Sequence, residues 1–338
     1  MLNKPFTYKI SNSKYIIEKR LGEGGFSQVY QAKKIISGKS GKQYAIKVFK
    51  VNNQCQLKII KKEIALNKII TESQNPFFIK YIPSSINGTS FENGLETQKY
   101  NIIFELASKG DLFKYLSSGG TGFKDSICKI LLYKILKALQ ALHKIGICHR
   151  DIKPHNIFLN GEQFEVKIGD FGLSALIMGK NGKILVKGIV GTKEYMAPEI
   201  FFEEKYDGEK VDIFSTGVLL FFLRKLKVPF ASATFVENGS NYENLYYYIK
   251  EKDEKKYWEY IGIDGLSPEF KKLFFKMVAF DPKERPTIEE ILKDDWMKEV
   301  TNLNEEEYKK YEEELIKELK SREKTNNEAK TFFQKKNL

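Results

Sequence analysis

Residues 149–156 read His149-Arg150-Asp151-Ile152-Lys153-Pro154-His155-Asn156, and the short segment Asp170-Phe171-Gly172 follows closely. Together they place two aspartates, an amide and a lysine on two loops about one β-hairpin apart. Carboxylate and amide oxygens are ligands that magnesium prefers, and an ammonium group neutralises phosphate, so this inventory suits phosphate chemistry. Either segment alone could be an ordinary polar turn. The two segments in this order and at this spacing are hard to produce by accident.

Two further motifs precede these loops. A glycine-rich stretch, Gly22 to Val29, lies between two β-type runs, and glycines let backbone N–H groups approach phosphates closely. A third β-type run then carries Tyr44-Ala45-Ile46-Lys47, and the apolar spacing at 56–71 predicts a helix that offers Glu63. A lone strand lysine is usually a surface residue. The order of glycines, lysine and helix glutamate instead favours a Lys47–Glu63 ion pair.

These motifs resemble those of the eukaryotic protein kinases of the serine/threonine type, over residues 15–300. The lysine two positions after Asp151 and the segment Gly191 to Glu199 are typical of that type. Within the family, Gly110-Asp111-Leu112-Phe113 and the region Tyr257 to Trp296 are most similar to the calcium/calmodulin-dependent group.

The resemblance implies an α+β, bilobed protein kinase fold with a small β-rich N-lobe and a larger α-helical C-lobe. We expect an N-terminal extension at 1–14, the N-lobe at 15–104, a hinge at 105–110, the C-lobe at 111–300 and a charged tail at 301–338. Strand-type runs come first and helical patterns later, which agrees with this division.

The implied function is that of an ATP-dependent serine/threonine protein kinase. It would transfer the γ-phosphoryl of Mg-ATP to serine or threonine hydroxyls of protein substrates in intracellular signalling. In this family Asp151 would orient the substrate hydroxyl, Lys153 would neutralise the γ-phosphoryl, and Asn156 and Asp170 would hold Mg²⁺. Thr192 would bond both Asp151 and Lys153.

The nucleotide-binding residues follow by position in the same motifs. Phe104 would be the gatekeeper beside the adenine, and the backbone from Glu105 to Ala107 would bond it. The full expected set is Leu21, Gly22, Gly24, Val29, Ala45, Lys47, Glu63, Phe104, Glu105, Ala107, Phe158 and Asp170. Plain core packing would account equally well for the apolar members.

Several positions depart from the family pattern. Asn67 stands where an apolar residue usually packs behind the phenylalanine of Asp-Phe-Gly, which keeps open a non-catalytic scaffold on the same fold. Gly188 stands where many kinases carry a phosphorylated residue, although Arg150, the usual receiver of that phosphate, is present. We therefore expect activity without phosphorylation within residues 175–191. The basic side chains there (Lys180, Lys183 and Lys187) are expected to repel Arg150.

The composition fits a globular protein of 338 residues, with 42% hydrophobic residues and a net charge of +12. The lysines are scattered without a nucleic-acid motif, so nucleic acid is not an expected partner. The three cysteines show no paired spacing, and the longest apolar run, Ile213 to Leu223, is too short to span a bilayer. We expect no membrane association and a cytoplasmic location, with the nucleus as the alternative. The oligomeric state is left open.

The remaining pattern gives the coarse organisation. Strands are expected at Phe77 to Ile82 and Tyr100 to Glu105, with a long loop from Ser84 to Lys99. Helices are expected from Asp125 onward and at 211–225, 242–250, 268–279 and 287–297. The Glu/Lys-rich tail could form a solvated helix but carries too few apolar residues to pack as a domain. Folding on a partner, or back onto the catalytic lobe, is left open. An aromatic cluster is either a docking surface or, preferably, packing in the C-lobe: Tyr242, Tyr246, Tyr247, Tyr248, Tyr257 and Trp258.

Overall fold

The computed structural model describes residues 7–36, 39–51, 53–92, 95–118, 120–179, 182–234 and 245–336. The chain divides into two compact units, residues 1–108 and residues 109–338. This boundary falls inside the segment 105–110 that the sequence predicts as a hinge. Within the described ranges, no helix combines the length and the apolar character needed to cross a membrane.

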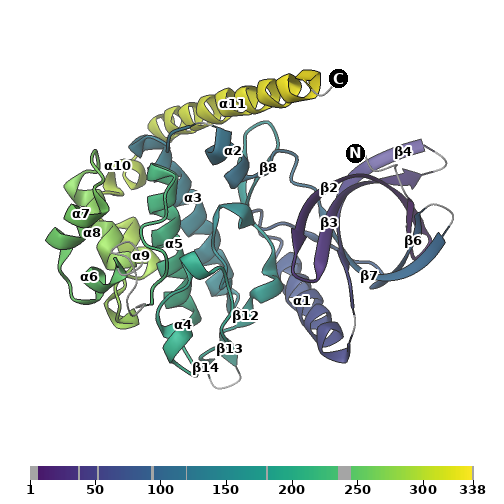
Figure 1. Ribbon diagram of the computed structural model, residues 1–338, viewed down its shortest axis with the longest axis horizontal. Helices are drawn as coiled ribbons and strands as arrows, with labels where there is room; N and C mark the ends of the chain where they lie inside the picture. Colours follow the sequence, from purple (N-terminus) through teal and green to yellow (C-terminus); the bar gives the residue numbers. More distant parts are fainter. Residues whose placement is uncertain are drawn as a thin grey trace. The chain divides into compact units, whose positions relative to one another are not determined.

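The first unit is a β-sheet with one long helix. Its elements are β1 (Thr7–Ile10), β2 (Ser13–Gly24), β3 (Ser27–Ile36), β4 (Lys39–Phe49), α1 (Gln54–Glu72), β5 (Tyr81–Ile82), β6 (Asn87–Glu92) and β7 (Leu95–Glu105). The sheet order is β4-β3-β2-β1-β6-β7-β5, and β4 also pairs with β7. That extra pairing closes the sheet into a ring, which Figure 1 shows as a curved set of strands.

Strand β7 closes the ring because it is long enough to pair twice. Its first half pairs antiparallel with β6 and its second half with β4, so that Tyr100 lies opposite both Asn87 and Phe49. A cluster of buried side chains fills the sheet: Tyr8, Ile10, Tyr15, Ile17, Ala32, Ile46 and Ile103. Gly88 is needed there, because a Cβ atom would lie 2.5 Å from the ring of Tyr8.

Three sequence expectations for this unit need correction. Residues 84–99 are not a long loop, because most of them form β6 and the first half of β7. Residues 7–14 do not extend away from the unit either: β1 pairs with both β2 and β6. The expected strand Phe77 to Ile82 is present only at Tyr81–Ile82.

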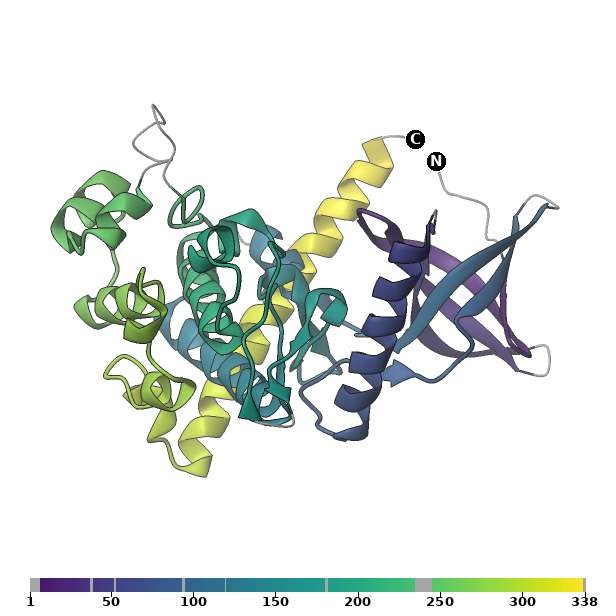
Figure 2. The ribbon, with the colours of Figure 1, turned by 90° about the horizontal axis from the view of Figure 1, so that it is seen from below.

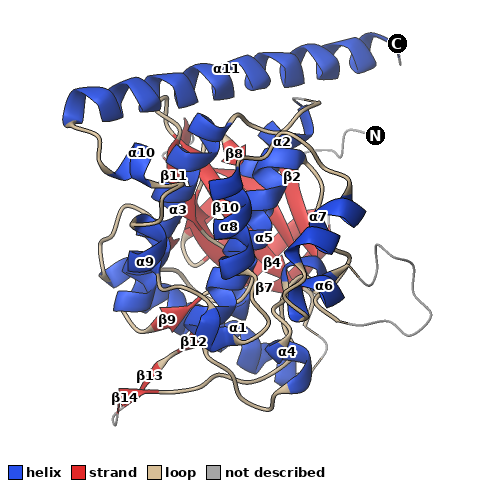
Figure 3. Cartoon of the chain, turned by 90° about the vertical axis from the view of Figure 1, so that its left-hand side faces the viewer, coloured by secondary structure: helices blue, strands red, loops and turns tan. Residues whose placement is uncertain are grey.

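The second unit is mainly helical. Its helices are α2 (Leu112–Ser118), α3 (Asp125–Lys144), α4 (Glu199–Phe202), α5 (Gly208–Lys225), α6 (Tyr246–Lys250), α7 (Glu254–Ile261), α8 (Pro268–Met277), α9 (Ile288–Leu292), α10 (Lys298–Thr301) and α11 (Glu305–Lys336). Its strands are β8 (Gly110–Asp111), β9 (Ile147–Cys148), β10 (Ile157–Asn160), β11 (Glu165–Ile168), β12 (Ala175–Leu176), β13 (Met178–Gly179) and β14 (Gly182–Lys183). Short 3₁₀ turns lie at Pro154–Asn156, Phe171–Leu173, Lys193–Tyr195 and Pro282–Glu284. In Figure 3 the β13–β14 pair projects beyond the helices.

Helices α3 and α5 form the centre of this unit. Both are apolar over most of their surface and carry long runs of buried residues, as expected for helices surrounded by others. Asp207 caps α5 by accepting a hydrogen bond from the backbone of Glu209, and Thr287 and Glu290 form a capping box on α9. The cysteines Cys55, Cys128 and Cys148 are free.

The C-terminal tail forms the long helix α11, which packs against α2 and α3 (Figures 1 and 2). Its side chains Leu315 and Leu319 are buried. The guanidinium of Arg322 stacks 4.1 Å from the ring centroid of Phe123 and donates to the backbone oxygen of Thr121. The tail therefore folds back onto the helical unit, which is one of the outcomes that the sequence left open.

The aromatic cluster is largely part of the packing. Tyr246 and Tyr257 are buried, and Trp258 lies against Phe221 and Phe274. Tyr247 and Tyr248 contact each other, with Tyr247 exposed. Tyr242 lies outside the described residues, as does the first part of the helix expected at 242–250.

Candidate active site

The glycine-rich stretch forms the hairpin between β2 and β3. Its register places Gly24 opposite Ser27, and Gly22 opposite Val29. Val29 in turn lies opposite Lys47 on β4. Because directly opposed residues share a face of a sheet, Val29 and Lys47 point to the same side as the glycine hairpin. Leu21 lies at a register shift in β2 and is exposed.

Lys47 forms the ion pair that the sequence predicts. Its Nζ lies 2.8 Å from Oε1 of Glu63, whose side chain is almost fully buried. Glu63 lies on helix α1, which Asn53 caps by accepting a hydrogen bond from the backbone of Gln56. A buried ion pair fixes geometry when both partners are present. The lysine is therefore held at a defined position on the sheet.

Asn67 is buried one turn after Glu63 and does not interrupt α1. Its amide Nδ2 donates to the backbone oxygen of Glu63 at 2.8 Å. Its Oδ1 accepts no hydrogen bond from the described residues. The helix and the Lys47–Glu63 pair form despite this departure from the family pattern.

The residues expected around the adenine on the first unit share one region of the sheet. Ala45 lies opposite Phe104, and Tyr44 lies opposite Glu105. The ring of Phe104 is partly buried and makes an edge contact with Tyr81, at 6.4 Å between centroids. Glu105 ends β7, where its backbone N–H donates to Lys80, and Ala107 follows in an irregular segment.

In the second unit, four predicted residues form one hydrogen-bonded network. Oδ1 of Asp151 accepts from the hydroxyl of Thr192 at 2.8 Å. Oδ2 accepts from the amide of Asn156 at 2.9 Å and lies 2.9 Å from Nζ of Lys153. Lys153 also donates to Thr192 at 2.6 Å. Both oxygens of the aspartate are thus oriented, and the lysine and threonine lie beside them.

Asp170 lies in the segment that is bonded to this network. It follows β11, has a left-handed backbone with φ of 60°, and is exposed. The preceding Gly169 donates to the backbone oxygen of Asn156 at 3.1 Å. Non-glycine residues rarely adopt this conformation, and where they do it often marks a functional site. The next residue, Phe171, is buried and contacts the ring of His149.

The sequence did not predict which residue supports the catalytic loop, residues 149–156. Asp212, buried on α5, accepts hydrogen bonds from the backbone of His149 at 2.8 Å and of Arg150 at 2.7 Å. Its Oδ2 also lies 2.8 Å from Nε2 of His143. The sequence could not show which backbone groups this carboxylate would meet, because His149 and Arg150 lie more than 60 residues before it.

Phe158 on β10 lies opposite Asp111 on β8. Burial raises the pKa of Asp111. The ring of His155 stacks on Phe113 at 4.1 Å between centroids, and desolvation lowers the pKa of this histidine. These groups lie near the catalytic loop, since His155 belongs to the 3₁₀ turn that also carries Asn156.

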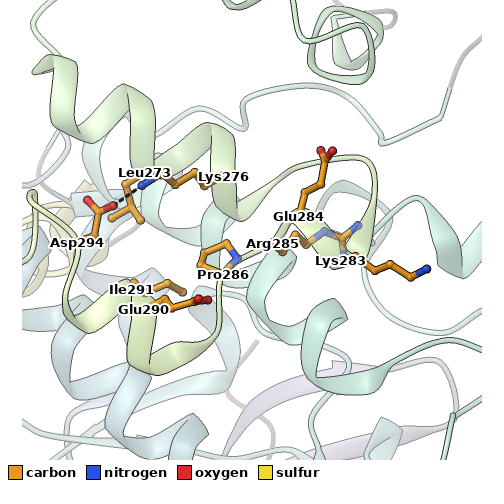
Figure 4. A pocket seen from close by; sticks show the side chains of 9 residues that line it. All are labelled: Leu273, Lys276, Lys283, Glu284, Arg285, Pro286, Glu290, Ile291 and Asp294. Atoms are coloured by element: carbon orange, nitrogen blue, oxygen red, sulfur yellow. Dashed lines mark hydrogen bonds and ion pairs between the residues drawn. The ribbon is translucent and has the colours of Figure 1, made fainter.

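Glu199 and Arg285 form a buried ion pair by two short bonds, at 2.6 and 2.7 Å. Arg285 also lines a pocket of about 400 Å³ beside α8 and α9, shown in Figure 4. In that pocket Lys276 and Asp294 pair at 2.8 Å. None of its lining residues belongs to the predicted nucleotide or catalytic set.

The two units each carry parts that phosphoryl transfer requires: a glycine hairpin with a paired lysine, and an oriented aspartate with an amide and a second aspartate. The protein kinase domain family matches residues 15–297, and the chain belongs to this family.

Similar proteins include CBL-interacting protein kinase 26 of Oryza sativa subsp. japonica, 30% identical over 291 residues, which cover 86% of this chain and 53% of that protein. CBL-interacting serine/threonine-protein kinase 20 of Arabidopsis thaliana is 32% identical over 286 residues, covering 84% of this chain and 58% of that protein. The chain thus spans little more than half the length of these relatives.

Proposed function

We propose that this chain is an ATP-dependent serine/threonine protein kinase that phosphorylates protein substrates in intracellular signalling. The observation that carries the proposal is the network of Asp151, Lys153, Asn156 and Thr192. Membership of the protein kinase domain family supports it, and so do relatives named as serine/threonine-protein kinases.

The network suits the attack of a hydroxyl on a phosphoryl group. Asp151 would orient the substrate hydroxyl and accept its proton as the new oxygen–phosphorus bond forms and the bond to the departing ADP breaks. Lys153 would neutralise charge on the transferred group. Because Thr192 and Asn156 already hold the carboxylate, little reorganisation is needed during the reaction.

The donor set near Asp151 fits magnesium bound together with phosphates. The carboxylate of Asp170 and the amide oxygen of Asn156 are hard oxygen ligands. The amide nitrogen of Asn156 donates to Asp151, so its oxygen is directed away from that residue. When bound, Mg²⁺ would neutralise phosphate charge. On the first unit, Lys47 would bind the α- and β-phosphates, and the glycine hairpin would offer backbone N–H groups.

A non-catalytic scaffold is the alternative from another class. Its main support in the sequence is Asn67. That support is weakened because α1 continues through Asn67 and Lys47 meets Glu63. A cytoplasmic location, with the nucleus as the alternative, is also proposed. The three free cysteines support it because they fit a reducing compartment.

The test of the activity is Asp151→Asn, assayed with a mixture of generic protein substrates. We expect transfer to fall by about 10²–10⁴-fold, because the proton acceptor is lost, while ATP affinity stays within about twofold. Asp295→Asn is the matched control, since Asp295 is an exposed aspartate paired only with nearby Lys298 among the described ion pairs. Wild-type turnover in the Asp151 variant would remove the assignment.

A further inference from the structure

Arg150 bridges distant parts of the segment 173–191, which we call the activation segment. Its side chain is buried. Nε donates to the backbone oxygen of Leu173 at 2.8 Å, and Nη1 donates to that of Lys187 at 2.9 Å. Nη1 also lies 3.3 Å from the hydroxyl of Tyr206. The guanidinium therefore meets carbonyl and phenol oxygens, where the sequence predicted repulsion by neighbouring lysines.

The charge of Lys183, one of the lysines expected to repel Arg150, is compensated by other residues. Lys183 lies 2.8 Å from Asp207 and 2.5 Å from Glu209, near the start of α5. Its charge is thus compensated by two carboxylates. Lys180, also expected to repel Arg150, lies outside the described residues.

Tyr206 forms hydrogen bonds with residues 186–188 of the activation segment. Its hydroxyl donates to the backbone oxygen of Gly188 at 2.6 Å. Its own backbone exchanges two hydrogen bonds with Val186, both 2.9 Å long. Tyr206 is buried, and burial raises the pKa of its hydroxyl, so the group stays protonated and able to donate. Tyr206 thus forms hydrogen bonds with Val186 and Gly188 and contacts Arg150.

Phosphate has no evident place in this arrangement. The activation segment contains one hydroxyl side chain, Ser174, and that side chain is buried and donates to the backbone of His149. At Gly188 the backbone φ is +100°, which L-residues with side chains rarely adopt. A phosphorylated residue would bring an anion to Arg150. Here Tyr206 supplies an uncharged oxygen instead.

We propose that Tyr206 is a positioning residue that keeps residues 186–188 beside Arg150, so that the activation segment is ordered without phosphate. The inference rests on the proposed kinase function and adds how that site is regulated. Four residues after Gly188, Thr192 donates to Asp151 and accepts from Lys153. A loosened Gly188 would therefore disturb the orientation of the catalytic carboxylate.

The experiment uses the full chain made in bacteria, treated with phosphatase and shown by mass spectrometry to carry no phosphate. We expect this protein to be active. Tyr206→Phe removes one oxygen and leaves the Gly188 carbonyl without its donor, so we expect kcat to fall about tenfold with the KM for ATP little changed. Limited proteolysis by trypsin should also cleave the variant faster after Lys187.

Tyr246→Phe is the matched control. Tyr246 is also buried, and its hydroxyl donates to the backbone of Val278 at 3.0 Å, outside the activation segment. We expect this variant to keep wild-type kcat and wild-type cleavage after Lys187, even if its melting temperature falls as much as that of Tyr206→Phe.

Three results would overturn the inference. The first is an inactive dephosphorylated chain that phosphorylation within the activation segment rescues. The second is wild-type kcat and cleavage in Tyr206→Phe, and the third is an equal loss in both tyrosine variants. If the wild type transfers no phosphate to any substrate, the proposed function fails. Cleavage after Lys187 still decides the role of Tyr206 in that case.

Discussion

Asn67 is a buried polar residue inside helix α1. The side chain is fully buried, and its Oδ1 accepts no bond from the described part of the chain. Leucine has a similar branched shape and needs no acceptor. We therefore expect Asn67→Leu to raise the free energy of unfolding by about 1 kcal/mol, measured by urea denaturation.

The companion variant is Asn67→Asp, which would bury a carboxylate one turn from Glu63 and should lower stability clearly. A decrease in stability for the leucine variant would show that the amide is needed where it stands.

At the residue scale, the sequence predicted the members of the Asp151 network and the Lys47–Glu63 pair, because each belongs to a motif with fixed spacing. The structure brings those residues within hydrogen-bonding distance in each unit. Asp212 and Tyr206 were not predicted as supporting residues. Asp212 contacts His149 and Arg150 from more than 60 residues away, and Tyr206 contacts Arg150 from 56 residues away, so no local pattern encodes these contacts.

Among the elements, α11 is the helix whose packing is least expected from its composition. The helix is rich in charge, yet Leu319 is fully buried. Truncating a buried leucine costs about 2–5 kcal/mol, so we expect Leu319→Ala to lower the unfolding free energy by that amount in urea denaturation. Lys310→Ala is the control, because Lys310 forms only an exposed pair with Glu306 among the described contacts and should change stability by less than about 0.5 kcal/mol.

If Leu319→Ala unfolded at the same urea concentration as the wild type, α11 would not be held on the helical unit in solution.

Ion pairs between α11 and the rest of the helical unit accompany the contact made by the buried leucines. Glu314 lies 3.1 Å from Lys124, and Glu323 lies 3.2 Å from Lys109. The tail carries as many basic as acidic side chains, so α11 adds no net charge to the chain.

The sequence predicted the long helices α1, α3 and α5 because their apolar residues extend over many turns. It failed at β6 for a physical reason. That strand, Asn87–Glu92, is short and polar, so its pairing with other strands identifies it as a strand and its own sequence does not. One of those partners, β1, lies about eighty residues earlier in the chain. Strand formation there depends on tertiary pairing, which single-sequence propensity does not capture.

For the whole molecule, ligand linkage offers a test of the nucleotide and metal proposals together. A ligand at 100 times its dissociation constant stabilises the folded state by about 2.7 kcal/mol. We expect ATP with Mg²⁺ to raise the melting temperature measurably. Asp170→Asn should remove the part of this rise that requires Mg²⁺, while Asp295→Asn should keep it. An undiminished magnesium effect in the Asp170 variant would show that this carboxylate does not hold the metal.

The closed ring of strands restricts where a shorter fragment of the protein can begin. The family match begins at residue 15, but β1 ends before it and lies between β2 and β6. A fragment starting at residue 15 would lose that strand and leave two rows of backbone donors and acceptors unpaired. Such open edges recruit strands from other molecules. Fragments designed on the family boundary should therefore aggregate, whereas those starting before Thr7 should remain dispersed.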